Sequence, residues 1–553
     1  MEIVNSRVFF LVLTIILFIS CSEGDNDITN QQPSGFETVV SEIKATSALL
    51  KWNESIDPQG STVFYDVFLE SVKVIDNTTD LTFAFNDLEE NTSYTGEVVA
   101  SDPEGNTVSE SFAFETSLNQ PPTGFSVSVN YVDPFYTRIE WNASVDPEGE
   151  SIRYEVYLQN ELIGETPDDL YYILPELKGL TFYSGKVIAF DESGKSEESQ
   201  FSFSTGLKVY SDNPDLDTQD KINDFGSKGY NVIEDNLTIG SNNFLTNVID
   251  LTPLKDIQSI SGDLLIKNTL CTNLIGLENL KSSYQYTNLT IESNDQLINL
   301  DGLEGFSSLH EVYIVDNEKL THIEGLSKLS SISNYISIIL NPSLNSIQGL
   351  RNLESVSNRL NISNNDSLIA LDGLQNIITT GEIEIIANDN LQTLNGLDNL
   401  GFCSSLIISE NISLSDLTAL SNLSTAGSLS ITDSPSLISL QGLNNLVQIS
   451  HTVRIARNSN LETLSGIENI VFPNSYHELV IWENEKITNL NPLENYTFKK
   501  GKVTIYFNSN LTDFCGITKL VTEIEDFIND YNFASNNGYN PQESDILNGN
   551  CSL

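Results

Sequence analysis

One pattern, L-x-I-x-x-N-x-x-L-x-x-L-x-G-L, recurs twelve times between Asn236 and Ile517 and limits the possible folds more than any other feature. Its clearest copy runs from Leu360 to Leu374. The central isoleucines follow one another at intervals of 23 to 27 residues and are Ile239, Ile266, Ile291, Ile314, Ile338, Ile362, Ile385, Ile408, Ile431, Ile455, Ile481 and Ile505. Such a period is typical of solenoids, in which each turn buries its apolar edge only against its neighbours. The sequence therefore predicts a parallel β solenoid.

The residue types within each turn define an inside and a corner. Leu360 and Ile362 are two residues apart, so both side chains point inward from the same strand. Asparagine stands three residues after the isoleucine in ten turns, at Asn242, Asn294, Asn317, Asn341, Asn365, Asn388, Asn411, Asn458, Asn484 and Asn508. An amide both donates and accepts, so stacked asparagines are expected to form an internal ladder that caps free backbone groups. An asparagine-lined ligand groove is the alternative.

The corner of most turns carries a glycine before the last core residue, as at Gly373. This position indicates positive φ or a close approach of two backbones. The order of strand, Asn, Leu, Leu, Gly and Leu over residues 236–520 resembles the receptor L-domains, the leucine-rich modules of growth-factor receptor ectodomains. The resemblance implies a binding module but names no ligand, because one fold hosts many functions.

The segments that flank the repeats are expected to cover the two ends of the solenoid. Residues 207–235 are predicted to form a linker and an N-terminal cap, with a short amphipathic helix from Lys221 to Gly226. Residues 521–553 break the period and are predicted to form a C-terminal cap. A solenoid needs such caps because an open end exposes its core to water.

Residues 34–206 show short alternating runs between Pro, Gly and Asp turns, which predicts all-β sandwiches. The pattern occurs twice, in residues 34–117 and 118–206. Each copy has a strand that ends in a core tryptophan, Trp52 or Trp141, and a later segment like a tyrosine corner. Both copies resemble the fibronectin type III family. The fold class expected for the whole chain is mainly β, with two fibronectin type III-like sandwiches followed by a leucine-rich, L-domain-like parallel β solenoid.

Acidic turns follow the tryptophan strands, at Asp57-Pro58-Gln59-Gly60 and Asp146-Pro147-Glu148-Gly149, and Asp102-Pro103-Glu104-Gly105 is similar. Asp, Pro and Gly each favour a tight turn, which explains these stretches without a ligand. A calcium ion needs six or more converging oxygens. We therefore predict no metal site and no cofactor, while calcium binding by these turns stays open as the alternative.

The charge balance and the absence of catalytic motifs exclude several functions. The chain has 26 basic and 77 acidic residues, a net charge of −51, which excludes a protein that binds the phosphate backbone of nucleic acids. Its four histidines do not occur in HExxH or a comparable spacing, and no GxSxG or P-loop sequence is present. We predict that the protein is not an enzyme.

The N-terminus predicts export and lipid anchoring. Arg7 precedes an apolar run, residues 8–19, that is too short to span a bilayer, which indicates a signal peptide over residues 1–20. Phe18-Ile19-Ser20-Cys21 resembles a bacterial lipobox, although leucine is usual where Phe18 stands. The resemblance implies lipidation of Cys21 and an acidic tether over residues 21–33. It places the protein in the cell envelope, as a surface-exposed outer-membrane lipoprotein of a Gram-negative bacterium. A plain secretory signal is the alternative.

The four remaining cysteines divide into two pairs with different expected roles. Cys515 and Cys551 flank the C-terminal cap and are predicted to form a disulfide in an oxidising compartment. Cys271 and Cys403 lie more than five repeats apart, too far for a bond. They are expected to be small buried side chains.

The outward strand positions are where a solenoid binds a partner. Trp482 and Tyr506 occupy equivalent places in adjacent turns, so their rings are expected about 4.8 Å apart on the outer face. Tyr313, Arg454 and Glu384 complete the candidate ligand-binding set. The alternative for the aromatic pair is that it shields the last turns beneath the cap.

The function expected from these features is a lipid-anchored, cell-surface binding or adhesion protein. Its two fibronectin type III modules form a stalk, and its solenoid engages an extracellular protein or glycan. The membrane is contacted through the lipid anchor alone. Two alternatives are a glycan-binding accessory protein of a nutrient-uptake system and a structural envelope protein.

Overall fold

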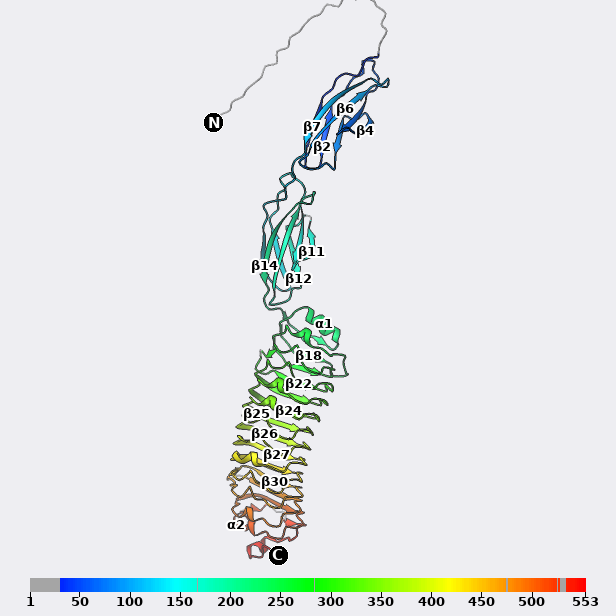
Figure 1. The fold of residues 1–553 in the computed structure, drawn as a ribbon. Helices are drawn as coiled ribbons and strands as arrows, with labels where there is room; N and C mark the ends of the chain where they lie inside the picture. The colour runs from blue at the N-terminus through cyan, green and yellow to red at the C-terminus, as the bar shows by residue number, and fades with distance from the viewer. Residues whose placement is uncertain (1–29, 167, 283, 474–475, 525, 528–533) are drawn as a thin grey trace, which may run out of the picture. The chain divides into compact units, whose positions relative to one another are not determined.

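The computed structural model describes the 553-residue chain except for residues 1–29, 167, 283, 474–475, 525 and 528–533 (Figure 1). The predicted signal peptide, Cys21 and most of the predicted tether therefore lie outside the described residues. Among the residues that are described, no helix is long and apolar enough to cross a membrane. The fold is mainly β, as predicted: two fibronectin type III-like modules precede a parallel β solenoid.

The first module is a sandwich of two antiparallel sheets around one core. One sheet has the order β1-β2-β5, formed by β1 (Thr38–Ser41), β2 (Ala48–Trp52) and β5 (Thr82–Phe85). The other has the order β4-β3-β6-β7, formed by β4 (Val72–Thr78), β3 (Phe64–Leu69), β6 (Ser93–Ser101) and β7 (Thr107–Glu115). Trp52 is buried in this core, with its ring centroid 5.7 Å from that of Tyr65. It is therefore a packing residue, as expected.

The second module repeats both strand orders. One sheet contains β12 (Tyr171–Pro175), β9 (Tyr136–Trp141) and β8 (Val127–Tyr131), and the other contains β11 (Glu161–Thr166), β10 (Arg153–Leu158), β13 (Phe182–Phe190) and β14 (Ser196–Ser204). The predicted tyrosine corners are present in both modules. Tyr94 accepts a 2.8 Å hydrogen bond from the backbone N–H of Glu89, and Tyr183 accepts the same bond from Lys178.

The solenoid is built on one 16-stranded parallel sheet, stacked turn on turn (Figure 1). Its strands are β16 (Asp215–Leu216), β18 (Leu237–Gly240), β20 (Leu264–Lys267), β22 (Asn288–Glu292), β23 (Ser308–Val315), β24 (Ser331–Ile339), β25 (Ser355–Ser363), β26 (Thr379–Ile386), β27 (Phe402–Ser409), β28 (Thr425–Thr432), β29 (Gln448–Ile449), β30 (Thr452–Ala456), β31 (Tyr476–Trp482), β32 (Lys500–Tyr506), β33 (Asp526–Phe527) and β34 (Ala534–Ser535). A second, four-stranded sheet contains β15 (Val209–Tyr210), β17 (Val232–Ile233), β19 (Ser259–Ile260) and β21 (Lys281–Ser282). Residues 209–216, expected to be linker, thus already pair with the first turns.

The core of the solenoid is a single column of stacked aliphatic side chains. All twelve central isoleucines are at most 1% exposed and stand in register from strand to strand, as in the pair Ile338 and Ile362. Short 3₁₀ helices form the opposite corner in several turns: Thr252–Leu254, Glu324–Leu326, Gln348–Leu350, Thr418–Asn422, Asn491–Leu493 and Cys515–Ile517. Because each turn contacts only its neighbours, the apolar column extends along the whole stack.

The predicted asparagine ladder exists and is fully buried over most of the solenoid. At Asn341, the backbone N–H donates to Asn365 Oδ1 at 3.2 Å, while Nδ2 donates to the carbonyls of Ile314 and Ile339 at 3.0 Å. Each amide therefore joins three turns. The ladder is an internal structural element, and the side chains from Asn294 to Asn508 that form it are not a ligand groove.

The two ends of the ladder differ from the expectation. Asn242 is exposed, and the first buried position is taken by Thr269, which donates to Asn294 Oδ1. The first turn contains a longer loop that turns Asn242 toward solvent. At the other end Asn537, in the C-terminal cap, accepts from the backbone N–H of Asn508 at 2.9 Å and extends the ladder.

A column of residues with positive φ lies between the strands and the ladder. From Ile266 onward, the residue two after each central isoleucine has φ of 52 to 60°: Asn268, Ser293, Asp316, Leu340, Asn364, Ala387, Glu410, Asp433, Arg457, Glu483 and Phe507. The N–H of each donates to a carbonyl of the following turn, as Leu340 does to Ser363 at 3.1 Å. That bond offsets the cost of about 1 kcal/mol for a left-handed non-glycine residue. Strand alternation predicts an inward Phe507, but this conformation turns its ring outward, and Phe507 is 46% exposed.

The corner glycines were expected to need either positive φ or close backbone approach, and Gly373 shows both. Gly373 has φ of 129°, and a Cβ on it would lie 2.2 Å from the carbonyl oxygen of Ile347 in the preceding turn. Gly349, inside a 3₁₀ helix, lacks positive φ, but a Cβ there would lie 1.9 Å from the Ile323 oxygen. Close backbone approach is therefore the requirement that these corners share.

Both ends of the stack are covered. Helix α1 (Gln219–Ser227), which contains the predicted amphipathic segment, buries Ile222 and Phe225 in the solenoid core. At the other end, α2 (Thr518–Glu523) buries Leu520 and Val521 in the core, and α3 (Glu543–Leu547) buries Ile546 there. Cys515 and Cys551 form the predicted disulfide, with Cα atoms 4.9 Å apart. Cys271 and Cys403 are buried free thiols, also as predicted, and burial raises the pKa of Cys271 to about 11.

Candidate binding surface

The outer face of β20 to β32 is less exposed than the sequence predicts. Two columns of outward side chains run down it in strict register, for example Tyr313, Ser337, Asn361 and Glu384. Most of these side chains are half-buried, and Val480 is only 3% exposed. Strands in a sheet lie about 4.8 Å apart, so neighbouring side chains on the same face cover one another. The face is a shallow, partly apolar surface.

The middle of this face, which we call the glutamate cluster, contains Tyr313, Asn361 and Glu384. Asn361 Nδ2 donates to Glu384 Oε2 at 2.8 Å, and Arg359 lies 3.9 Å from the other Glu384 oxygen. Burial raises the pKa of Glu384, and Arg359 lowers it only in part. Tyr313 donates to Glu311 at 3.0 Å, and burial together with this bond raises its pKa to about 12.

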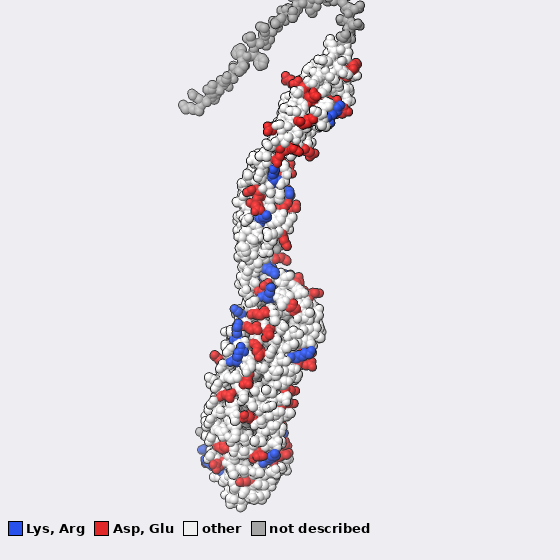
Figure 2. All heavy atoms as spheres, in the orientation of Figure 1, with Lys and Arg blue, Asp and Glu red and all other residues white. Residues whose placement is uncertain are grey.

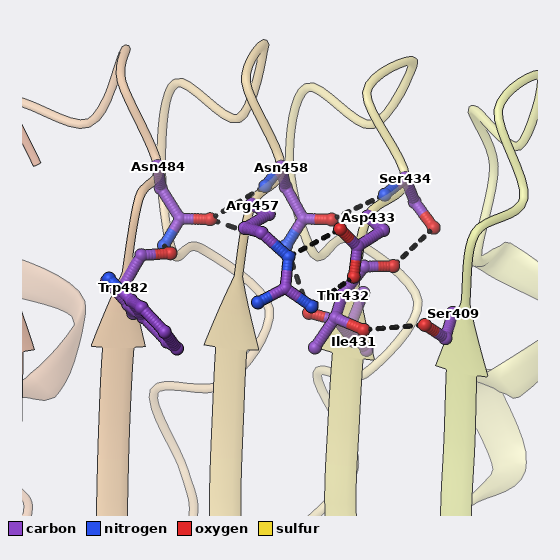
Figure 3. Close-up of polar contacts among 9 residues, drawn as sticks. All are labelled: Ser409, Ile431, Thr432, Asp433, Ser434, Arg457, Asn458, Trp482 and Asn484. Atoms are coloured by element: carbon purple, nitrogen blue, oxygen red, sulfur yellow. Dashed lines mark hydrogen bonds and ion pairs between the residues drawn. The ribbon is translucent and has the colours of Figure 1, made fainter. Parts of the chain in front are cut away.

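Further along the same face, Asp433, Arg457 and Trp482 form a second group, the arginine cluster (Figure 3). Arg457 Nε and Nη2 donate to the two Asp433 oxygens at 2.5 and 2.6 Å, a bidentate pair. The hydrogen bond from Arg457 lowers the pKa of Asp433. The Trp482 ring lies toward the Arg457 guanidinium, with its centroid 5.6 Å from the arginine Cζ.

A shallow hollow of about 360 Å³ lies beside the arginine cluster. Its lining contains the apolar residues Ile412 and Pro435, the carboxylates of Asp389 and Glu410, and the ion pair between Asp433 and Arg457. Ile412 is 49% exposed. The arrangement suits a partner side chain that has an apolar stem and a positive end.

Three of the five predicted ligand-binding residues belong to these two clusters, and the other two lie outside them. Tyr313 and Glu384 belong to the glutamate cluster and Trp482 to the arginine cluster. Arg454 lies on the outer face between Ser430 and Val480, half-buried. Tyr506 is opposite Trp482 in the register, as predicted, and is half-buried between Trp482 and Ser535 of β34 in the cap. The pair is therefore not an open aromatic platform.

A third feature was not identified from the sequence. Tyr284 and Tyr286 are 52% and 49% exposed, and their ring centroids are 5.4 Å apart in an edge-to-face arrangement. The Tyr286 ring also packs edge-on against His310, at 5.3 Å. Beside this tyrosine cluster lies a hollow of about 300 Å³ lined by Lys281, Ser282, Tyr284, Gln285, Gly305, Ser307 and Ser308. The sequence signal for it was Tyr284-Gln285-Tyr286, which places two aromatic residues just before the strand that begins at Asn288.

The surface charge is predominantly negative. Figure 2 shows more acidic than basic side chains over the visible face, in keeping with the net charge of −51. Among the residues that the structure describes, no group of three or more His, Cys, Asp or Glu side chains is arranged to hold a metal ion. The candidate surface as described thus offers hydrogen bonds, apolar contacts and negative charge.

Comparison with known proteins supports the architecture. The receptor L domain family profile matches residues 231–328. These residues contain the first turns of the solenoid, so the match agrees with the resemblance seen in the repeats. No curated protein matches the chain.

Solved structures of fibronectin type III modules are similar to the N-terminal part. The fibronectin(III)-like modules of Clostridium thermocellum CbhA have 12% identity and a TM-score of 0.16, over 31% of this chain and 95% of that one. A two-domain fibronectin type III segment of chicken tenascin has 17% identity and a TM-score of 0.16, over 31% of this chain and 99% of that one. The strand orders and tyrosine corners described above carry the assignment.

Proposed function

We propose that the chain is a lipid-anchored cell-surface protein whose solenoid presents its outer face to a macromolecular partner. The receptor L domain match and the fibronectin type III-like modules suggest an extracellular binding or adhesion protein. Cys21 is the proposed lipid anchor, in the outer membrane of a Gram-negative cell. The two modules follow the anchor in the sequence and act as a spacer.

The observation that carries this proposal is the composition of the outer face. Val315, Ile339, Ile386 and Ile407 are half-buried there among polar side chains. A surface that only contacts water needs no such aliphatic residues, whereas protein interfaces combine an apolar centre with polar neighbours. The arginine cluster adds a tryptophan and a bidentate ion pair, the residue types that dominate interface energies.

The experiment that tests the proposal uses arginine substitutions on two faces. Ser337 and Ser430 lie in the outward columns, whereas Ser421 lies exposed in a 3₁₀ helix at the opposite corner. Purified wild-type protein and the variants are applied to arrays of extracellular proteins and glycans. A partner that uses the outer face should bind the Ser337→Arg and Ser430→Arg double variant at least about tenfold more weakly. Ser421→Arg should bind normally, and equal losses in both would contradict the proposed face.

The lipid anchor is tested separately, because the binding face does not depend on it. A cell that expresses the wild-type chain should incorporate a labelled fatty acid into it, and Cys21→Ser should abolish the label. Equal labelling of both proteins would refute the anchor and leave the binding function untouched.

A glycan is the second candidate partner, and the tyrosine cluster specifically favours it. The apolar C–H groups of a sugar ring pack against aromatic faces, and its hydroxyls bond to side chains such as Ser307 and Gln285. On the same arrays, a glycan bound there should be lost in the Tyr284→Ala and Tyr286→Ala double variant. A glycan bound at the predicted aromatic pair should instead be lost in Trp482→Ala and Tyr506→Ala.

A further inference from the structure

One end of the second fibronectin type III-like module contains buried polar side chains, which lie outside the candidate binding surface on the solenoid. Asn119, Asp146 and Asp191 are 4%, 7% and 3% exposed. They come from the segment before β8, the acidic turn after β9 and the turn between β13 and β14. Carboxylates are almost never buried to this extent without a partner.

Hydrogen bonds of 2.8 to 3.0 Å join Asn119 to Asp191 and hold Asp146 within its own turn. Asn119 Nδ2 donates to Asp191 Oδ2 at 2.8 Å. Asp146 Oδ1 accepts the backbone N–H groups of Glu148 and Glu150, at 3.0 and 2.9 Å. The Lys195 N–H donates to Asp191 Oδ1 at 2.7 Å, so both oxygens of Asp191 and one oxygen of Asp146 are held in a fixed direction.

The three segments are also tied to one another, which brings the side chains to the same end of the module. Thr123 and Val145 exchange two backbone hydrogen bonds of 2.9 Å, so the chain after Asn119 runs beside the residue that precedes Asp146. The Gln120 N–H donates to Glu148 Oε2 at 3.2 Å. Ser193, two residues after Asp191, donates to the Glu150 carboxylate at 3.2 Å.

Two oxygens in this cluster have no donor. Asn119 Oδ1 and Asp146 Oδ2 are buried without a hydrogen-bond partner among the described residues. Buried acceptors of this kind are rare and require an explanation. The nearby cation does not supply one, because Lys195 Nζ lies 2.8 Å from Glu90 and only its backbone N–H reaches Asp191.

We propose that Asn119, Asp146 and Asp191 bind one calcium ion, with water completing the six or more oxygens that the ion requires. All three offer oxygen, and the two orphan oxygens belong to an amide and a carboxylate, both of which are calcium ligands. Calcium accepts irregular oxygen sets, whereas magnesium demands a near-ideal octahedron and zinc prefers nitrogen and sulfur. Only two ligand side chains are acidic, so the affinity belongs in the range of extracellular modules, with a dissociation constant of about 10⁻⁴ to 10⁻³ M.

The first module has equivalent residues, with Asn30 Nδ2 donating to Asp102 Oδ2 at 3.2 Å, but no oxygen of Asn30, Asp57 or Asp102 is among the buried atoms of the described residues that lack a partner. Asp102 corresponds to Asp191, and Asn106 corresponds to Lys195. Asn106 donates to both Asp102 oxygens, through Nδ2 and its backbone N–H, each at 2.8 Å. Asp57, which corresponds to Asp146, accepts the Ser61 N–H at 2.6 Å on Oδ2. The first module therefore provides a matched control for the second.

The test is calorimetric titration of the purified protein with CaCl₂, up to about 10 mM, in about 0.15 M NaCl with a few millimolar MgCl₂. The salt and magnesium suppress loose binding to the many surface carboxylates. Asp146→Asn preserves the shape of the side chain and places an amide where the orphan oxygen is. Asp57→Asn makes the same change in the first module. Near-ultraviolet circular dichroism in calcium-free buffer establishes that each variant is folded, and Asn119→Ala replaces Asp146→Asn if the latter is not.

We expect the wild-type protein and Asp57→Asn to bind calcium saturably with equal affinity. Asp146→Asn, or Asn119→Ala in its place, should bind at least about tenfold more weakly. Absence of saturable binding in the wild type overturns the proposal, as does unchanged affinity in the second-module variants. Equal loss of affinity in Asp57→Asn overturns the assignment to the second module.

Discussion

Replacement of Asn365 by alanine tests whether the asparagine ladder holds the solenoid together. Asn365 lies near the middle of the stack and is fully buried. Its Nδ2 donates to the carbonyls of Ile338 and Ser363, at 2.9 and 3.0 Å, and its Oδ1 accepts the backbone N–H of Asn341 at 3.2 Å. Alanine leaves the Ile338 oxygen and the Asn341 N–H without these partners.

The size of the effect follows from the cost of those two groups. A buried polar group without a partner costs about 1–3 kcal/mol, and the lost amide volume adds about 1 kcal/mol. Asn365→Ala should therefore destabilise its region by about 3–7 kcal/mol. Asn376→Ala is the control, because Asn376 is exposed and donates one bond, to the Arg351 carbonyl at 2.9 Å. It should cost less than about 1 kcal/mol.

Hydrogen exchange is the appropriate assay, because repeat arrays open locally and one global transition does not describe them. The amides of residues 336–342 should exchange at least about 100-fold faster in Asn365→Ala, which corresponds to about 3 kcal/mol. Asn365→Asp keeps the shape but loses the donor, so it should destabilise at least as much at neutral pH. If exchange in Asn365→Ala matches that in Asn376→Ala, the ladder contributes little and the reasoning is wrong.

Three further predictions follow from single sites. Ser434 interrupts the asparagine ladder after Asn411. Ser434→Asn should therefore raise the local stability by about 1–2 kcal/mol in the same exchange assay. A loss of stability would show that the site has no room for the amide. The disulfide between Cys515 and Cys551 closes a loop of 36 residues, so replacing both cysteines by serine should lower the free energy of unfolding of the cap by about 3–4 kcal/mol. The amides after residue 534 should then exchange faster. Unchanged exchange would count against a stabilising role. Burial raises the pKa of Glu384, so the folded state holds this proton to a higher pH, and stability falls as pH rises above the ordinary Glu value of about 4.3. Glu384→Gln should remove this fall and be more stable than wild type at pH 7 in urea unfolding, and an unchanged pH profile would refute it.

Much of the architecture was predictable because it is local and repetitive. The interval between central isoleucines sets the length of a turn, and the same inward positions recur in each copy, so twelve buried isoleucines followed directly from the pattern. The asparagine ladder was predictable for the same reason. Its ends were not, since Asn242 and Asn537 depend on loops that do not repeat.

The candidate surface was predictable only in part. Register placed Trp482 opposite Tyr506, but the indole packs toward Arg457, whose left-handed backbone conformation the sequence pattern did not indicate. The tyrosine cluster was missed because Tyr286 contacts His310, a residue of the next turn. Side-chain contacts between turns depend on where each loop places its residues.

The sequence alone determined the period, the inward face, the two modules and the cysteine pairing of the cap, because each of these depends on spacing along the chain. Only the tertiary structure decided which outward side chains remain exposed and which buried oxygens lack a donor. Asn119, Asp146 and Asp191 are up to 72 residues apart, and three separate turns bring them to one end of a module. Burial and hydrogen bonding depend on every neighbour in space, so they exist only once the chain has folded.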